Sequence, residues 1–223
     1  VVVSLPAGGI VRTPTDADGI EIKALSLDRS DGSRIVDIGS LHIPAGERWF
    51  ISGPSGAGKS TMLRALAGLW TQGTGHISFN MRDAMFLPQR SYVPAGSLLQ
   101  ALSYPATPDR YARKACEEAL LATNLEFLMP DLENEAAWGD VLSPGEQQRL
   151  AFARVFLARP STLFLDEATS ALDEKNEADL YARLLERLPH ITLISVAPHA
   201  ALKAFHGQEM ILREQSVTVQ RLL

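Results

Sequence analysis

The stretch Gly53-Pro54-Ser55-Gly56-Ala57-Gly58-Lys59-Ser60 decides the fold of this chain of 223 residues. It matches the pattern G-x-x-x-x-G-K-[ST] in full, and it stands between a β-rich run at 47–52 and a helical pattern at 61–70. Glycines at this spacing let the backbone curl until successive N–H groups point at phosphate oxygens. The stretch therefore predicts a phosphate-binding loop rather than a glycine-rich turn that ends by chance in Lys-Ser.

Residue types in this loop match the chemistry of a nucleotide with its metal ion. The Lys59 ammonium can reach the β- and γ-phosphates, and the Ser60 hydroxyl can bind Mg²⁺. The helix that begins near Lys59 adds the positive end of its dipole. The predicted nucleotide-binding residues are Gly53, Pro54, Ser55, Gly56, Ala57, Gly58, Lys59, Ser60 and Thr61.

A second acidic element lies further along the chain. Residues 162–165 form an apolar run that predicts a buried strand, and Asp166 and Glu167 follow it. Because open α/β sheets place ligands at the carboxyl ends of their strands, Asp166 is predicted to hold Mg²⁺ through water. Glu167 is predicted to polarise an attacking water as a general base. A strand followed by a solvated acidic turn is the alternative, and the phosphate loop in the same chain argues against it.

Composition narrows the class of protein. The chain is 46% hydrophobic and 21% charged, which supports a packed core and excludes disorder as its main state. Its net charge of −5 argues against a general nucleic-acid binder. The lone cysteine, Cys116, fits a reducing compartment. No apolar run reaches the roughly 18–20 residues that span a bilayer, so this piece is expected to be soluble.

Strands and helices alternate along most of the chain, which predicts an α/β fold with a mainly parallel sheet. Strands are expected near 20–25, 41–43, 47–52, 162–165 and 191–196, helices near 61–70, 109–123, 144–158 and 175–188, and a hairpin turned at 214–215. Residues 1–18 are rich in glycine, proline and polar residues, and they are predicted to be a linker into a domain over 19–223.

Further motifs give the chain a resemblance to the ATP-binding cassette (ABC) ATPases over roughly residues 20–213. The stretch Leu142-Ser143-Pro144-Gly145-Glu146-Gln147 resembles their LSGGQ-type signature. Residues 167–174 resemble their catalytic glutamate and D-loop, and Gln89 resembles their Q-loop glutamine. The resemblance implies a P-loop NTPase fold with a mainly parallel core sheet and an antiparallel β-rich N-terminal part. It also implies an α-helical subdomain, about 91–158, that carries the signature.

The same resemblance implies hydrolysis of ATP, with Mg²⁺, by two domains that pair head to tail around two nucleotides. Ser143 and Gly145 stand just ahead of a helix, so their N–H groups can form a second anion site. The implied site residues are Glu167, Lys59 and Gln89 for catalysis, Ser60, Gln89 and Asp166 for the metal, Ser170 and Asp173 in the D-loop, and Ser143, Gly145, Glu146 and Gln147 for the partner's ATP.

A finer resemblance points to subfamily D of the ABC transporters. Residues 64–70, 85–98 and 145–154 resemble these half-transporters, in which a transmembrane domain precedes one nucleotide-binding domain. The implied partners are a transmembrane domain and a second copy of this domain, at the cytoplasmic face of a membrane such as the bacterial inner membrane. The alternatives are a soluble ABC ATPase of nucleic-acid repair or translation, and a slow cassette that binds ATP mainly as a switch.

The chain departs from the family pattern at two places. Pro198 falls on the position of the switch histidine, and His199 stands one residue later, so His199 is either that switch or an exposed loop residue. No aromatic residue stands near Leu27 to stack on adenine. Leu27 is expected to offer only an apolar contact, which predicts loose selectivity for adenine.

Other large side chains are interpreted as structural. Trp49 and Trp70 flank the phosphate loop and are predicted to lie in the core rather than to contact a ligand. Arg149 and Arg154 are predicted to be solvated or at an interface rather than to be arginine fingers. The transported substrate and the direction of transport are not determined by these residues.

Overall fold

A computed structural model of the chain describes residues 9–16 and 19–222, which form two compact units. The first unit contains the described residues up to Phe86 together with 161–166 and 190–222. The second unit contains 87–160 and 167–189. Among the described residues, none of the helices combines the length and the apolar run that a bilayer span requires.

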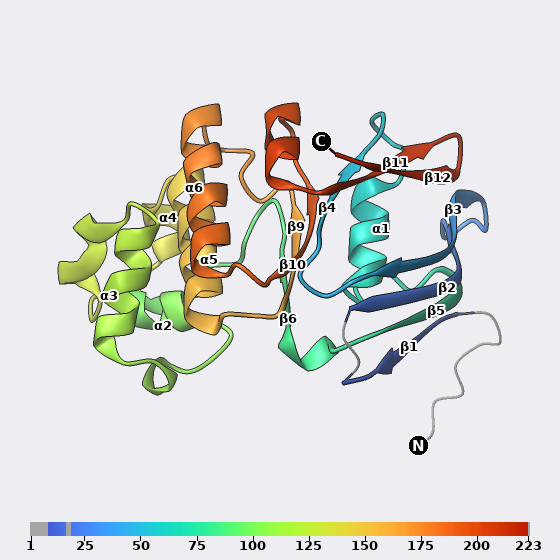
Figure 1. Cartoon of the computed structure of the whole chain (residues 1–223). Coiled ribbons are helices and arrows are strands. Elements are labelled where there is room, and N and C mark those ends of the chain that lie inside the picture. Colours follow the sequence, from blue (N-terminus) through green and yellow to red (C-terminus); the bar gives the residue numbers. More distant parts are fainter. Residues whose placement is uncertain (1–8, 17–18, 223) are drawn as a thin grey trace, which may run out of the picture. The chain divides into compact units, whose positions relative to one another are not determined.

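A mixed sheet organises the first unit (Figure 1). Ten strands of the described residues follow the order β1-β5-β2-β3-β12-β11-β4-β10-β9-β6. Their bounds are β1 (Ile10–Pro14), β2 (Ile20–Asp28), β3 (Arg34–Ile43), β4 (Arg48–Ser52), β5 (Gly73–Phe79), β6 (Ala84–Leu87), β9 (Thr162–Asp166), β10 (Thr192–Val196), β11 (Gln208–Arg213) and β12 (Ser216–Arg221).

The pairing of these strands confirms the predicted fold class. The pairs β11–β4, β4–β10 and β10–β9 are parallel, whereas β2 pairs antiparallel with both β3 and β5. All residues of β9 and β10 are buried, as the continuous apolar runs of a central parallel strand require. Helix α1 (Lys59–Leu66) contacts β9 and β10 and buries Met62, Leu63, Ala65 and Leu66 in the core of this unit.

Residues 10–14, within the stretch predicted to be a linker, form the edge strand β1. This strand pairs in parallel with β5, and Ile10 is buried in the core. The Arg12 guanidinium donates to Ala65 O at 3.0 Å and to Trp70 O, so β1 is also attached to the end of α1. Residues 1–8 and 17–18 lie outside the described residues. That residues 1–18 lead out of a transmembrane domain, and that the nucleotide-binding domain covers 19–223, stay predictions.

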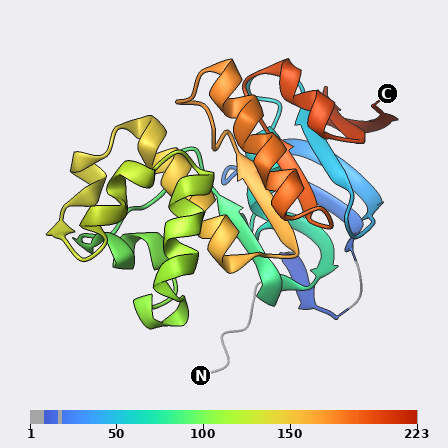
Figure 2. The same ribbon diagram turned by 60° about the vertical axis from the view of Figure 1, so that its left-hand side comes forward.

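The second unit is mainly helical and contains the segment 91–158 that was predicted to be a helical subdomain. Helix α5 packs against α2 and α3 (Figure 1 and Figure 2). The helices are α2 (Leu98–Ser103), α3 (Arg113–Ala122), α4 (Trp138–Val141), α5 (Pro144–Ala158) and α6 (Glu174–Arg187), and β7 (Gly96–Ser97) pairs with β8 (Glu135–Ala136).

Candidate phosphate-binding site

The phosphate loop connects β4 to α1 in the first unit. Gly53, Gly56 and Gly58 all have positive φ, which the absence of a side chain permits. At Gly58 a Cβ atom would lie 2.6 Å from Ile35 Cγ2, so a larger residue does not fit without a shift. Lys59 Nζ donates to the carbonyl oxygens of Gly53 and Pro54, each at 2.9 Å. The ammonium is therefore held over the loop, in a position to bind a phosphate.

Asp166 lies buried at the carboxyl end of β9, also in the first unit. Its Oδ1 accepts a hydrogen bond from Ser60 Oγ at 2.6 Å, and its Oδ2 accepts one from Arg64 Nη2 at 2.9 Å. The structure thus brings together two of the predicted metal-binding residues. Arg64 had not been singled out. Its spacing of four residues from Ser60 places both on one face of α1, which is the signal that could have found it.

The oxygen donors at this point fit Mg²⁺. A hydroxyl and a carboxylate, from Ser60 and Asp166, are the hard ligands that this ion prefers. Mg²⁺ keeps waters or phosphate oxygens as its other ligands, so a site with few protein donors suits it. Gln89, the third predicted ligand, belongs to the second unit.

Within the second unit, the predicted catalytic glutamate meets the predicted Q-loop glutamine. Gln89 Nε2 donates to Glu167 Oε2 at 3.1 Å. Glu167 has a φ of 52°, a left-handed conformation that is uncommon and costly for a residue with a side chain. Ser170 N donates to Glu167 O at 3.1 Å and closes the turn that follows. This turn therefore holds Glu167 in a conformation that directs its carboxylate to Gln89.

The signature residues Ser143, Glu146 and Gln147 have hydrogen-bond partners close to them in the chain. The Ser143 N–H and hydroxyl donate to Glu146 Oε2 at 2.8 and 2.7 Å, and the Ser143 side chain in turn accepts from Glu146 N. This reciprocal cap starts α5. The hydrogen bond from the Ser143 hydroxyl lowers the pKa of Glu146. Gln147 Nε2 donates to Gly139 O and Leu142 O, at 2.7 and 2.9 Å. Contact of these residues with a partner's nucleotide stays a prediction.

The D-loop residues also have local partners. Ser170 Oγ accepts from Gln148 Nε2 at 3.2 Å, and Asp173 caps α6 by accepting from Asn176 N at 2.9 Å. The backbone hydrogen bond from Asn176 lowers the pKa of Asp173. A Cβ atom at Gly145 would lie 3.3 Å from Ala171 O, so the signature packs closely against the D-loop. Gln148 had not been singled out from the sequence.

Two histidines in the first unit differ in their surroundings. His199 is half-buried and directly precedes the short 3₁₀ helix Ala200–Phe205, and its carbonyl accepts from Leu202 N; Pro198 is exposed. His206 is buried, with Nδ1 2.8 Å from Leu202 O and Nε2 3.0 Å from Ser195 Oγ. Burial lowers the pKa of His206 to about 4, so the ring is neutral at pH 7. A role of His199 as the switch stays a prediction.

Two expectations from the sequence were wrong. Leu27 is fully buried in the core of the first unit, so its side chain cannot offer the predicted contact to a base. Arg154 is not solvated: it is 6% exposed and donates to Ala101 O and Tyr92 O. Trp49 is buried, as predicted, whereas Trp70 is half-buried at the edge of the core.

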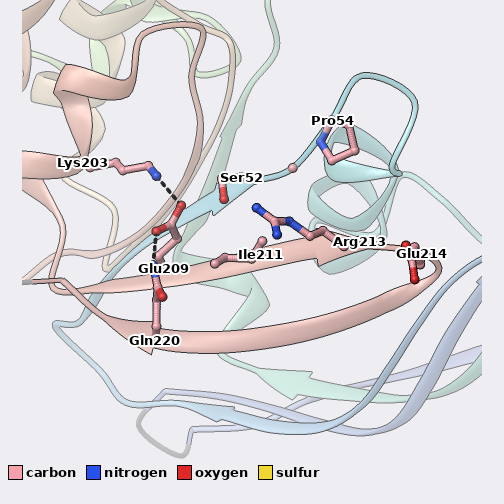
Figure 3. Close-up of a pocket in the computed structure, with 9 residues that line it drawn as sticks. Ser52, Pro54, Lys203, Glu209, Ile211, Arg213, Glu214 and Gln220 are labelled. Atoms are coloured by element: carbon pink, nitrogen blue, oxygen red, sulfur yellow. Dashed lines mark hydrogen bonds and ion pairs between the residues drawn. The ribbon is translucent and has the colours of Figure 1, made fainter.

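A hollow of about 660 Å³ borders the start of the phosphate loop (Figure 3). Glu209 lies buried in its wall and accepts from Lys203 Nζ at 2.5 Å and from Gln220 Nε2 at 2.7 Å. Burial raises the pKa of Glu209, but hydrogen bonds from Lys203, Ser52 and Gln220 outweigh burial and lower it overall. The hollow is lined by Ser52, Gly53, Pro54, Lys203, Glu209, Ile211, Arg213, Glu214 and Gln220. Lys59, Ser60 and Asp166 are not among these lining residues.

Comparison with known proteins gives consistent matches. A protein from Haemophilus influenzae named "Uncharacterized ABC transporter ATP-binding protein" is 41% identical over 202 residues, which cover 91% of this chain and 34% of that protein. The human "Lysosomal cobalamin transporter ABCD4" is 38% identical over 219 residues, with coverage of 91% and 35%. A structure titled "Structure of a bacterial Atm1-family ABC exporter with ATP bound" matches with a TM-score of 0.80 and 25% identity, over 97% of this chain and 40% of that one.

The match to the human ABCD4 protein agrees with the resemblance to subfamily D. The chain spans about one third of the length of the curated relatives it matches. A sequence model described as "ABC transporter" matches residues 36–170, which is more than half of the 223 residues. The chain therefore belongs to the ABC transporter family.

Proposed function

We propose that the chain is the ATP-binding and ATP-hydrolysing domain of a membrane ABC transporter. The observation that carries this proposal is the contact between Ser60 and Asp166 beside a loop over which Lys59 is held. Names of relatives include the words "ATP-binding protein", and ATP is bound in the matching exporter structure. These names support ATP as the nucleotide.

Binding of ATP uses groups that are already in place. The backbone N–H groups of the phosphate loop, which Pro54 lacks, bind phosphate oxygens, and Lys59 exchanges its two loop carbonyls for phosphate oxygens. Ser60 and Asp166 would hold Mg²⁺, which would supply neutralisation of the phosphate charge. Arg64 keeps the carboxylate of Asp166 oriented.

Hydrolysis is assigned to Glu167, the residue directly after Asp166 in the chain. Its carboxylate accepts a proton from the water that attacks the γ-phosphorus, while the amide of Gln89 orients the carboxylate. Lys59 stabilises the negative charge that builds up on the transferred phosphoryl group. ADP and inorganic phosphate leave as products.

Transport requires parts outside this chain. We assign as partners a transmembrane domain and a second copy of the nucleotide-binding domain, which pairs head to tail through Ser143 and Gly145 when ATP binds. The greater length of the relatives supports a further domain. The protein is assigned to the cytoplasmic face of a membrane. A second candidate, a slow cassette that uses ATP mainly as a switch, is favoured by Pro198 at the position of the family histidine.

Two substitutions test the proposal by separating affinity from turnover. Glu167→Gln removes the base but keeps an oxygen that accepts from Gln89, so steady-state hydrolysis should fall by about 100-fold or more with ATP affinity retained. Lys59→Ala should weaken ATP binding by roughly 100-fold, because several charge-assisted contacts are lost. Lys114→Ala, at an exposed lysine of α3, is the matched control and should change neither. Unchanged turnover in Glu167→Gln or unchanged affinity in Lys59→Ala would contradict these assignments.

A further inference from the structure

Gln148 closes a ring of hydrogen bonds in the second unit. Its Nε2 donates to Gln89 O at 3.1 Å and to Ser170 Oγ at 3.2 Å. The Gln89 side chain donates to Glu167 Oε2, and Glu167 O accepts from Ser170 N, each at 3.1 Å. The ring thus runs from Gln148 through Gln89, Glu167 and Ser170 back to Gln148, and it contains both predicted catalytic residues of this unit.

The orientation of the Gln148 amide is determined by its partners. Ala171 N–H donates to Gln148 Oε1 at 2.9 Å, and an N–H group cannot donate to an NH₂ group. Both hydrogens of Nε2 therefore point to acceptors, one in the Gln89 segment and one in the D-loop. Gln148 is 5% exposed, so these hydrogen bonds have little competition from water.

Glu167 needs such support because of its backbone. Its φ of 52° is a costly conformation for a residue with a side chain, and it persists only where surrounding contacts hold it. Gln148 contacts two segments that hold this glutamate. Ser170 and Ala171 belong to the turn that follows Glu167, and Gln89 donates a hydrogen bond to the Glu167 carboxylate. Loss of Gln148 removes the hydrogen-bonded connection between the Gln89 segment and the D-loop.

We propose that Gln148 is a positioning residue that couples the signature helix α5 to the catalytic pair Gln89 and Glu167. Gln148 directly follows the signature residue Gln147 in the first turns of α5, so a shift of that helix end moves the Gln148 amide and both segments attached to it. The inference rests on the proposed function. When a nucleotide bound to a second copy contacts the signature residues of this chain, the contact thereby changes the position of Glu167 in this chain.

Hydrogen exchange tests the coupling without any need for activity. In Gln148→Met, peptides that cover 167–173 and 87–91 should exchange their amide hydrogens about tenfold faster, as expected for the loss of buried hydrogen bonds. Peptides of the phosphate loop should exchange at the wild-type rate. Gln72→Met, at an exposed glutamine of the first unit, is the matched control. Wild-type exchange at 167–173 in Gln148→Met overturns the proposal.

Kinetics tests the catalytic part of the inference. Gln148→Met and Gln148→Glu should lower kcat for ATP hydrolysis about 10- to 100-fold, because the base is misplaced, with KM and ATP affinity changed by less than about twofold. Gln148→Glu keeps the side-chain length and the acceptor for Ala171 N but loses both donors. Gln89→Ala in the Gln148→Met background should cost less than it does in the wild-type background, since both residues act through Glu167.

The outcomes separate this inference from the proposed function. A wild-type protein without ATPase activity contradicts the proposed function, and hydrogen exchange still decides whether Gln148 holds the ring. Wild-type hydrolysis that persists unchanged in both Gln148 variants overturns the positioning role alone. A fall in ATP affinity equal to the fall in kcat/KM also overturns it, because a positioning residue for the base acts on turnover.

Discussion

Ser60 Oγ donates to Asp166 Oδ1 at 2.6 Å although 106 residues separate the two in the chain. The contact joins the first turn of α1 to the carboxyl end of β9, and both elements lie in the first unit. The carboxylate is almost fully buried, so hydrogen-bond donors of the protein must replace the water it has lost. Its partners are the Ser60 hydroxyl and the Arg64 guanidinium.

Loss of Arg64 should destabilise the first unit. Arg64→Met leaves the carboxylate of Asp166 with one donor fewer, and the half-exposed position of Arg64 reduces the cost relative to that of a fully buried pair. We expect the free energy of unfolding to fall by about 2 kcal/mol in urea denaturation. Arg82→Met, at an exposed arginine, is the control and should stay within about 0.5 kcal/mol of wild type. Equal values for the two variants would show that the ion pair contributes nothing.

His206 should make stability depend on pH. The pKa of this histidine is about 4 in the folded protein, whereas that of a solvent-exposed histidine is 6.5, because burial disfavours the charged ring. Between these values the unfolded chain binds a proton that the folded chain does not. The free energy of unfolding therefore has its full value, as far as His206 is concerned, above pH 6.5 and falls as the pH is lowered below it. The loss should reach about 2 kcal/mol by pH 5.

The measurement for His206 is the free energy of unfolding at pH 7.5 and at pH 5. His206→Gln removes the titrating group, and its stability should fall less than that of the wild type between these two pH values. His190→Gln replaces an exposed histidine and should keep the pH dependence of the wild type. A His206→Gln variant with the full wild-type dependence would assign the effect to other groups.

Arg154 should be required for the stability of the second unit. Its guanidinium donates to Tyr92 O at 2.8 Å and to Ala101 O at 2.9 Å, and it lies over the Tyr104 ring. Burial lowers the pKa of Arg154 to about 10, so the group remains charged at pH 7. Arg154→Met should cost about 3 kcal/mol of unfolding free energy, since the buried Ala101 carbonyl and the partly buried Tyr92 carbonyl both lose their donor. The exposed Arg110→Met is the control, and a similarly small effect in both variants would contradict the role.

Selectivity between purine bases should be weak. No aromatic residue stands near Leu27 to stack on adenine. Leu27 itself is buried in the core, so it cannot contact the base either. Without the stacking energy of about 1 kcal/mol, ATP and GTP should bind with affinities that differ by less than about tenfold. Titration of the wild-type protein with each nucleotide in the presence of Mg²⁺ measures this. Strong preference for ATP would show that another group recognises the adenine.

Elements with strong local signals were predicted well from the sequence. Helix α5 has the predicted bounds, because Ser143 and Pro144 start it and its apolar residues repeat with helical period. The hairpin of β11 and β12 turns at Glu214 and Gln215, as predicted. Strand β1 was missed, since a short edge strand inside a segment rich in glycine and proline has little pattern of its own. Burial of Leu27 was missed for another reason: the alternation of a strand does not say which of its faces is covered.

The sequence by itself determined the phosphate loop, the buried strand with its two carboxylates and the order of the motifs, and hence the family. Each of these motifs consists of consecutive residues, so it can be recognised without knowledge of the fold. Tertiary structure decided which distant groups meet. Arg64 reaches Asp166, Gln148 joins the Gln89 segment to the D-loop, and Arg154 lies buried among backbone carbonyls. The physical reason is that a polar side chain that leaves water needs partners, and the packed fold alone determines which groups are near enough to serve.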